Sequence, residues 1–165
     1  MRQNSSQLRF VIWLSVVASL GGFLFGYDTA VISGTVDQVS TQFNLDDITK
    51  GWYVGCALVG SIGGVIAAGT LSDRFGRKIV MLLSSVLFTV SAIGCMISGS
   101  EDQLVIYRII GGIGIGVASV VSPLYIAEIS IPSFRGRLVS LYQLAITIGF
   151  LGAYLANYGL QQYSE

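Results

Sequence analysis

Two ionisable side chains, Asp28 and Arg108, border long uncharged stretches and are the residues best placed to do chemistry. Asp28 follows 18 uncharged residues, and Arg108 is followed by 19. Inserting a charged side chain at the centre of a bilayer costs about 2.5–3.5 kcal/mol on insertion scales, so such a residue usually has a function. If the two side chains meet, protonation of the Asp28 carboxylate releases Arg108, which makes the pair a candidate proton switch. A salt bridge that only pins two helices is the simpler alternative.

The elements that must position this pair are predicted to be membrane-spanning helices. Of the 165 residues, 53% are hydrophobic and only 11% are charged, and the mean hydropathy is +0.73. These values exclude an ordinary water-soluble domain and a disordered chain. A span needs about 20 apolar residues. The gaps between charges therefore predict an all-α membrane protein with five spans: 9–36, 51–72, 79–99, 103–127 and 138–161.

The basic residues predict the orientation of these spans. Lys and Arg concentrate in the short cytoplasmic loops of membrane proteins. With the N-terminus in the cytoplasm, only Lys50 faces outward and Arg108 lies within a span. The short loops favour a multi-pass protein of a bacterial inner membrane. The other seven basic residues then face inward: Arg2, Arg9, Arg74, Arg77, Lys78, Arg135 and Arg137.

Several classes of function are disfavoured by composition. Nine Lys and Arg balance nine Asp and Glu, so there is no basic excess to bind nucleic acid. The chain has no histidine, and Cys56 and Cys95 lie in apolar runs, where they are expected as buried thiols. We therefore expect no metal site and no cofactor. With no nucleophile–base pair in the sequence, we also expect no enzymatic activity.

Glycine is frequent inside the predicted spans, with 21 residues in the chain. Small residues four positions apart let membrane helices approach closely, where lipid gives no hydrophobic drive to associate. Helix packing is the interpretation we favour for all of these pairs. The spacing occurs at Gly22 and Gly26, Gly51 and Gly55, Gly60 and Gly64, and Gly112 and Gly116.

Two motifs carry a resemblance to a known family. Residues 69–78 read GTLSDRFGRK, which resembles the cytoplasmic signature of the major facilitator superfamily. Residues 123–128 read PLYIAE and are followed by RGR at 135–137, which resembles the sugar porter branch. Arg108 with its following glycines, and the FGYD run at 25–28, resemble proton-coupled members. The nearest likeness is to bacterial xylose, arabinose and galactose proton symporters, over about residues 10–160.

The resemblance implies roles for individual residues. Asp28 corresponds to the proton-coupling aspartate and Arg108 to its partner, while Phe25 and Gln143 match positions that contact sugar. The Gln143 amide can both donate to and accept from adjacent hydroxyls, although an interhelical hydrogen bond is an alternative. A cytoplasmic charge network that stabilises the outward-facing state corresponds to Asp73, Arg74, Arg77, Glu128 and Arg135.

The resemblance also implies a fold of twelve spans in two halves around one site near the midplane. This sequence corresponds to the first five spans, and we expect the sixth span and the C-terminal half to be absent from it. The predicted function is proton-coupled uptake of a monosaccharide, here as an N-terminal portion. The expected partners are the sugar, the proton, the lipid bilayer and the missing remainder. The alternatives are a non-transporting membrane fragment, or a sugar-binding or regulatory membrane protein that needs a partner chain.

Overall fold

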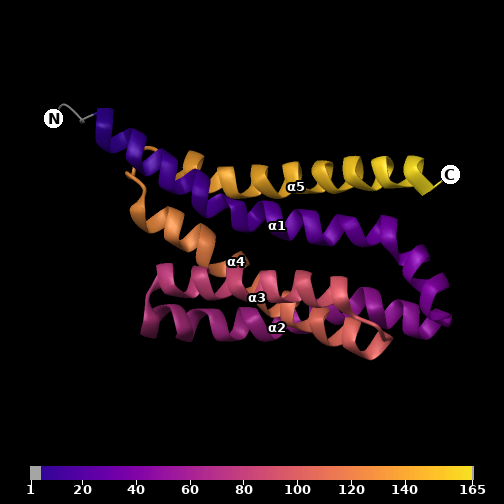
Figure 1. Cartoon of the computed structure of the whole chain (residues 1–165). Helices are drawn as coiled ribbons and strands as arrows, with labels where there is room; N and C mark the ends of the chain where they lie inside the picture. The colour runs from indigo at the N-terminus through magenta and orange to yellow at the C-terminus, as the bar shows by residue number, and fades with distance from the viewer. Residues whose placement is uncertain (1–4, 165) are drawn as a thin grey trace.

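A computed structural model describes residues 5–164, and all five elements in that range are α-helices (Figure 1). Each is long and apolar enough to cross a membrane, which confirms the all-α membrane class. The shortest, with 21 residues, is about 31 Å long at 1.5 Å per residue and so matches the hydrocarbon core. The helices extend from α1 Ser5–Phe43 through α2 Asp47–Phe75, α3 Arg77–Ile97 and α4 Glu101–Ile129 to α5 Arg135–Ser164.

The connections between helices follow local rules of helix capping. Asp46 precedes α2, and its carboxylate accepts a hydrogen bond from the Thr49 N–H at 3.1 Å. Gly76 separates α2 from α3 with a φ of 84°, a conformation that glycine adopts without steric cost. Its N–H donates to the Ser72 carbonyl at 3.0 Å, which closes α2 before the chain reverses.

The helices associate as two close pairs, α1 with α5 and α2 with α4, and α3 packs on α4 (Figure 1). In the second pair, a Cβ added to Gly112 would collide with the Ala57 carbonyl, and one added to Gly60 would collide with the Ile109 carbonyl. Each backbone therefore lies against the glycines of the other, as the small-residue spacing predicts.

The α1–α5 pair has the same reciprocal design. A side chain at Gly26 would collide with the Ile146 carbonyl, and one at Gly149 would collide with the Phe23 carbonyl. Gly51 and Gly55 differ, because a Cβ on either would meet no atom of the described chain within 4 Å. The described residues therefore support the packing interpretation at the other three predicted pairs, and at Gly51 and Gly55 it stays a prediction.

Helix α4 is the central helix of the bundle. It contacts all four other helices, and 56% of its apolar segment is buried, against 22–28% for the others. The outer helices expose large apolar side chains such as Phe10, Leu58 and Met96, as expected for surfaces that face lipid. A charged residue within the buried segment of α4, such as Arg108, is therefore enclosed by protein and needs a partner from a neighbouring helix.

The connections separate into two ends of the bundle (Figure 1). The start of α1 and the α2–α3 and α4–α5 connections lie at one end, and the α1–α2 and α3–α4 connections lie at the other. Six of the seven basic residues predicted to face the cytoplasm belong to the segments at the first end. The seventh, Arg2, lies outside the described residues. Which end is cytoplasmic stays a prediction.

Candidate functional site

The structure brings Asp28 and Arg108 together across two helices. The Arg108 Nη2 atom lies 3.6 Å from the Asp28 Oδ2 atom, an ion pair between α4 and α1. The side chains are only 9% and 23% exposed, respectively. The distance is longer than a charge-assisted hydrogen bond, which is about 2.7–2.9 Å. The two charges therefore attract each other without being locked together.

The Arg108 guanidinium has few other polar contacts. Its Nε atom is buried and has no hydrogen-bond partner among the described residues. The ring of Tyr53, on α2, lies with its centroid 5.5 Å from the guanidinium carbon. Tyr53 was not predicted as a site residue from the sequence. The helical spacing of Tyr53, Cys56, Gly60 and Gly64 indicates the face that α2 buries, but it does not separate a contact with a cation from ordinary packing.

The predicted sugar contacts, Phe25 and Gln143, lie on the neighbouring helices α1 and α5. Phe25 is half-buried and packs against a cluster that includes Tyr142 and Ile146. Gln143 is exposed, and its amide has no hydrogen-bond partner among the described residues. No interhelical hydrogen bond of this amide occurs among the described residues, and its contact with sugar stays a prediction.

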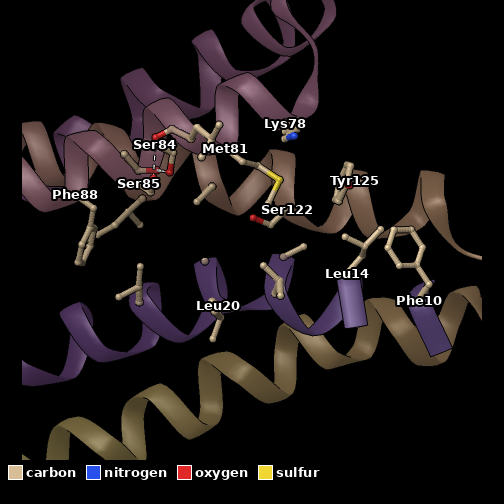
Figure 2. Close-up of a pocket in the computed structure, with 18 residues that line it drawn as sticks. Phe10, Leu14, Leu20, Lys78, Met81, Ser84, Ser85, Phe88, Ser122 and Tyr125 are labelled. Atoms are coloured by element: carbon tan, nitrogen blue, oxygen red, sulfur yellow. Dashed lines mark hydrogen bonds between the residues drawn. The ribbon is translucent and has the colours of Figure 1, made fainter. Parts of the chain in front are cut away.

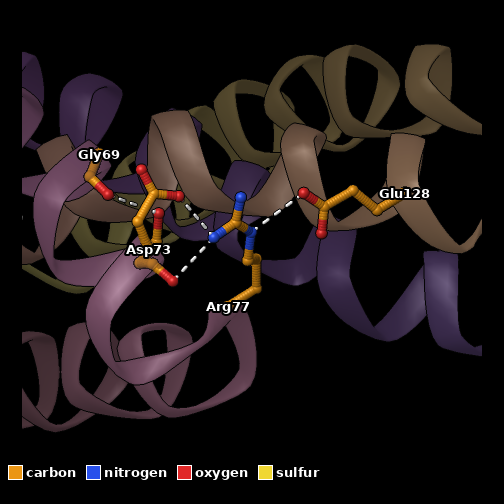
Figure 3. A network of polar contacts seen from close by, with 5 residues as sticks. Gly69, Asp73, Arg77 and Glu128 are labelled. Atoms are coloured by element: carbon orange, nitrogen blue, oxygen red, sulfur yellow. Dashed lines mark hydrogen bonds and ion pairs between the residues drawn. The ribbon is translucent and has the colours of Figure 1, made fainter.

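Arg77 is the centre of the charge network that was predicted to lie on the cytoplasmic side (Figure 3). Its Nη1 atom donates to the Asp73 carboxylate at 2.8 Å and to the Ser72 carbonyl at 2.8 Å. Its Nε atom donates to the Glu128 carboxylate at 3.0 Å. The network thus ties the α2–α3 connection to the end of α4, within a motif predicted from the sequence.

Two predicted members of this network lie apart from it. Arg74 stacks on the ring of Phe75 at 5.6 Å. Arg135 is exposed and makes no ion pair with any part of the chain that the structure describes. Arg77 directly follows the chain reversal at Gly76, so its side chain lies beside Glu128 and pairs with that carboxylate. Arg74 and Arg135 therefore do not pair with Glu128.

An apolar groove of about 660 Å³ runs between α1, α3 and α4 (Figure 2). Leu14, Phe88 and Tyr125 are among the side chains that line it. None of the predicted proton or sugar residues lies in its walls. A sugar needs hydrogen-bond partners for its hydroxyls, and these mostly aliphatic and aromatic walls offer few. The groove is therefore separate from the predicted sugar site.

No metal site is apparent in the described range. Residues 5–164 contain no group of three or more His, Cys, Asp or Glu side chains that could hold a metal ion. The enclosed pair between α1 and α4 consists instead of one carboxylate and one guanidinium, those of Asp28 and Arg108. A carboxylate beside a guanidinium can exchange a proton. The Gln143 amide, which can bind hydroxyl groups, lies exposed on α5.

Relatives of known name cover nearly all of this chain. A glucose transport protein of Synechocystis is 47% identical over 156 residues, which are 94% of this chain and 33% of that protein. An arabinose-proton symporter of Bacillus subtilis is 42% identical over 159 residues, 96% of this chain and 34% of that protein. A D-xylose-proton symporter of Escherichia coli is also 42% identical and covers 94% of this chain. This chain spans about a third of the length of these relatives.

Solved structures of similar proteins agree with the fold. The proton:xylose symporter XylE bound to 6-bromo-6-deoxy-D-glucose superposes with a TM-score of 0.88 at 41% identity. The match covers 97% of this chain and 38% of that one. An inward open conformation of XylE from E. coli gives a TM-score of 0.84 at 42% identity, covering 91% of this chain and 40% of that one. The five helices thus match the N-terminal part of a major facilitator fold.

The family model for the sugar (and other) transporters matches residues 14–165. Because this family consists of membrane transporters, the predictions of a multi-pass membrane protein and of a protein that is not an enzyme are confirmed. The motifs at 69–78 and 123–137 pointed to the same group. This chain belongs to the sugar (and other) transporter family, the sugar porters of the major facilitator superfamily.

Proposed function

We propose that this chain forms part of a secondary transporter that couples uptake of a monosaccharide to entry of a proton. Family membership supports the transport of a sugar, and relatives named as arabinose-, xylose- and galactose-proton symporters support the coupling to protons. The observation that carries the proposal is the enclosed ion pair between Asp28 and Arg108. A carboxylate held by one loose cation can gain and lose a proton as its surroundings change.

Asp28 is the proton carrier in this proposal, and Arg108 is the residue that responds. When the carboxylate is ionised, its attraction to Arg108 holds α1 against α4. A proton bound to a carboxylate oxygen removes the negative charge and therefore the ion pair. Helices α1 and α4 are then free to move relative to each other, which links protonation of Asp28 to a change of conformation.

Phe25 and Gln143 are the proposed sugar contacts. The Phe25 ring offers an apolar face to the carbon side of a sugar ring. The Gln143 amide, which is exposed and unpaired within the described residues, donates to one hydroxyl and accepts from the next. Their helices, α1 and α5, form one of the two close pairs.

The network around Arg77 is the proposed clasp of the outward-facing state. It joins Asp73 on α2 to Glu128 on α4. Arg74 and Arg135, which lie at the same end but outside this network, are proposed to bind groups beyond the described residues. We place this end in the cytoplasm of a bacterial inner membrane, because the basic residues gather there.

A chimera tests the proposal. Residues 1–165 replace the aligned third of the E. coli D-xylose-proton symporter, and vesicles of the chimera receive xylose, arabinose, galactose or glucose in turn. One-to-one coupling to an imposed difference of about one pH unit supports about tenfold accumulation, since both correspond to about 1.4 kcal/mol. We expect Asp28→Asn to reduce this ratio to about one while exchange of labelled sugar across the membrane continues.

The matched control is Asp37→Asn. Asp37 also lies on α1, but its side chain is 82% exposed and pairs with Lys50, so accumulation should persist. Full accumulation by the Asp28→Asn chimera would exclude Asp28 as the proton carrier. If the 165-residue chain binds sugar while the chimera moves none, a sugar-binding or regulatory role with a partner chain replaces the transport proposal.

A further inference from the structure

Tyr53 places an aromatic ring beside the charged group of Arg108. The ring centroid lies 5.5 Å from the guanidinium carbon, and Tyr53 is only 5% exposed. The electron-rich face of an aromatic ring attracts a cation within about 6 Å, and more strongly where water is excluded. The contact joins α2 to α4, so Arg108 has partners on two other helices, Asp28 being the second.

Arg108 depends on this ring more than most arginines would. Its guanidinium has one carboxylate at 3.6 Å and a buried Nε without a hydrogen-bond partner in the described chain. A buried cation with so few partners is costly unless other groups compensate it. Besides the Asp28 carboxylate, the structure places the Tyr53 ring against this charge.

The position of the ring is fixed by the packing of its helix. Gly60 and Gly64 hold α2 directly against the α4 backbone at Ile109 and Ile113. One turn after Tyr53, the fully buried Cys56 thiol donates to the Tyr53 carbonyl at 3.2 Å. The guanidinium carbon lies over the Tyr53 ring, so the ring face is what Arg108 meets.

We propose that Tyr53 is a positioning residue for the Arg108 guanidinium, which it holds near Asp28 when that carboxylate is charged and retains when that carboxylate is neutral. The inference rests on the proposed function, because it gives Arg108 a partner at the moment when the proton removes the ion pair. The ring attracts the cation without a hydrogen bond, so Arg108 can turn toward or away from Asp28 with its charge still compensated.

Graded substitutions at position 53 in the chimera test the role in coupling. Tyr53→Phe keeps the ring and should keep accumulation near that of the unchanged chimera. Tyr53→Leu removes the ring face and should slow proton-driven accumulation by roughly 2- to 30-fold, the range expected for loss of a cation–π contact. Exchange of labelled sugar should fall less than accumulation. Equal losses in Tyr53→Phe and Tyr53→Leu would overturn the role of the ring.

A double-mutant cycle tests the contact itself and needs no transport. The folding equilibrium of the 165-residue chain in mixed micelles is measured for Tyr53→Leu, with and without Arg108→Met. The effect of Tyr53→Leu should shrink at least twofold when Arg108 is absent. Tyr142→Leu is the matched control, because Tyr142 is also buried but packs on Gly22, and its effect should not change.

Two further results would overturn the proposal. The first is an effect of Tyr53→Leu that is the same with and without Arg108, since the ring would then only fill space. The second uses increasingly fluorinated phenylalanines at position 53, which weaken the attraction of the ring face for a cation at nearly constant shape. The proposal is overturned if none of these variants slows accumulation. This series also decides the question if Tyr53→Leu fails to fold. A chimera that never accumulates sugar refutes the proposed function instead, and the cycle still measures the contact.

Discussion

Arg77, the first residue of α3, lies against the C-terminal end of α4, whereas Arg108 belongs to the N-terminal part of α4 itself. The two arginines differ in the contacts that they make. Arg108 and Glu128, the α4 partner of Arg77, are about 30 Å apart along that helix at 1.5 Å per residue. Arg77 makes three short contacts, at 2.8 Å with the Ser72 carbonyl and at 2.8 and 3.0 Å with two carboxylates that are partly open to water. Arg108 makes one ion pair of 3.6 Å and one contact with an aromatic ring, both enclosed.

The difference shows what each centre is suited to do. A guanidinium with its donors satisfied on two sides holds one arrangement of helices. A guanidinium that is loosely paired in a buried place is sensitive to any change of charge beside it. The Arg77 centre therefore has the properties of a clasp, and the Arg108 centre has those of a switch.

The largest effect that would test this contrast is the loss of Arg108, measured against the loss of Arg77. Arg108→Met leaves the Asp28 carboxylate enclosed without a cation and should lower the free energy of unfolding by about 3 kcal/mol. Arg77→Met removes contacts between half-exposed groups and should cost about 1 kcal/mol. Reversible unfolding in mixed micelles measures both. Equal costs would break the distinction between an enclosed and an exposed centre.

A smaller effect should follow when α2 is pushed away from α4 near Arg108. A side chain at Gly112 would collide with the Ala57 carbonyl, so Gly112→Ala should cost about 2 kcal/mol, as over-packing does. Gly51→Ala is the control, because Gly51 has open space around it and alanine favours a helix. The same unfolding assay compares the two. Similar stability for both variants would contradict a tight α2–α4 contact.

The smallest effect concerns Asp46, an exposed acid outside both centres. Hydrogen bonds from the Thr49 side chain and then its backbone N–H hold the pKa of Asp46 below its ordinary value of 3.8. A lowered pKa stabilises the folded form above that value, and the gain is lost as the pH falls through the lower one. Protection of the Thr49 amide from hydrogen exchange should therefore persist at neutral pH and decline in acid below about pH 4.

Asp46→Asn provides the check on this cap. Asparagine also caps helices but does not titrate, so the acid-induced loss of Thr49 protection should disappear in this variant. A decline that stays the same would assign the effect to another group. Loss of the acid response in Asp46→Asn would show that this cap acts within one helix. Arg108 differs, because its partners belong to two other helices.

Much of the fold could be predicted from the sequence, because the bilayer imposes simple requirements. The long gaps between charges located all five helices, and the helices extend beyond most of the predicted spans since capping groups lie outside the apolar core. The packing of three glycine pairs also followed from their spacing. Gly51 and Gly55 have the same spacing but no neighbouring helix among residues 5–164, because spacing alone does not say which face a partner covers.

The candidate site was predictable in part. Asp28 and Arg108 stood out as charges in apolar surroundings, and the cytoplasmic motif pointed to Arg77. Tyr53 was not found, because an aromatic residue in an apolar helix has no signal that separates a contact with a cation from ordinary packing. The exclusion of Arg74 and Arg135 from the network also required coordinates, since the three predicted arginines compete for two carboxylates at that end.

The sequence by itself determined the membrane class, the five helices, the family and the charges that can do chemistry. These follow from residue type and spacing, which the one-dimensional order of the chain contains. Only the tertiary structure decided that the Asp28–Arg108 pair is loose, that Tyr53 stands beside it, and that Arg77 takes both Asp73 and Glu128. Distances between helices depend on how their faces interlock, and that is a property of the packed bundle rather than of any one segment.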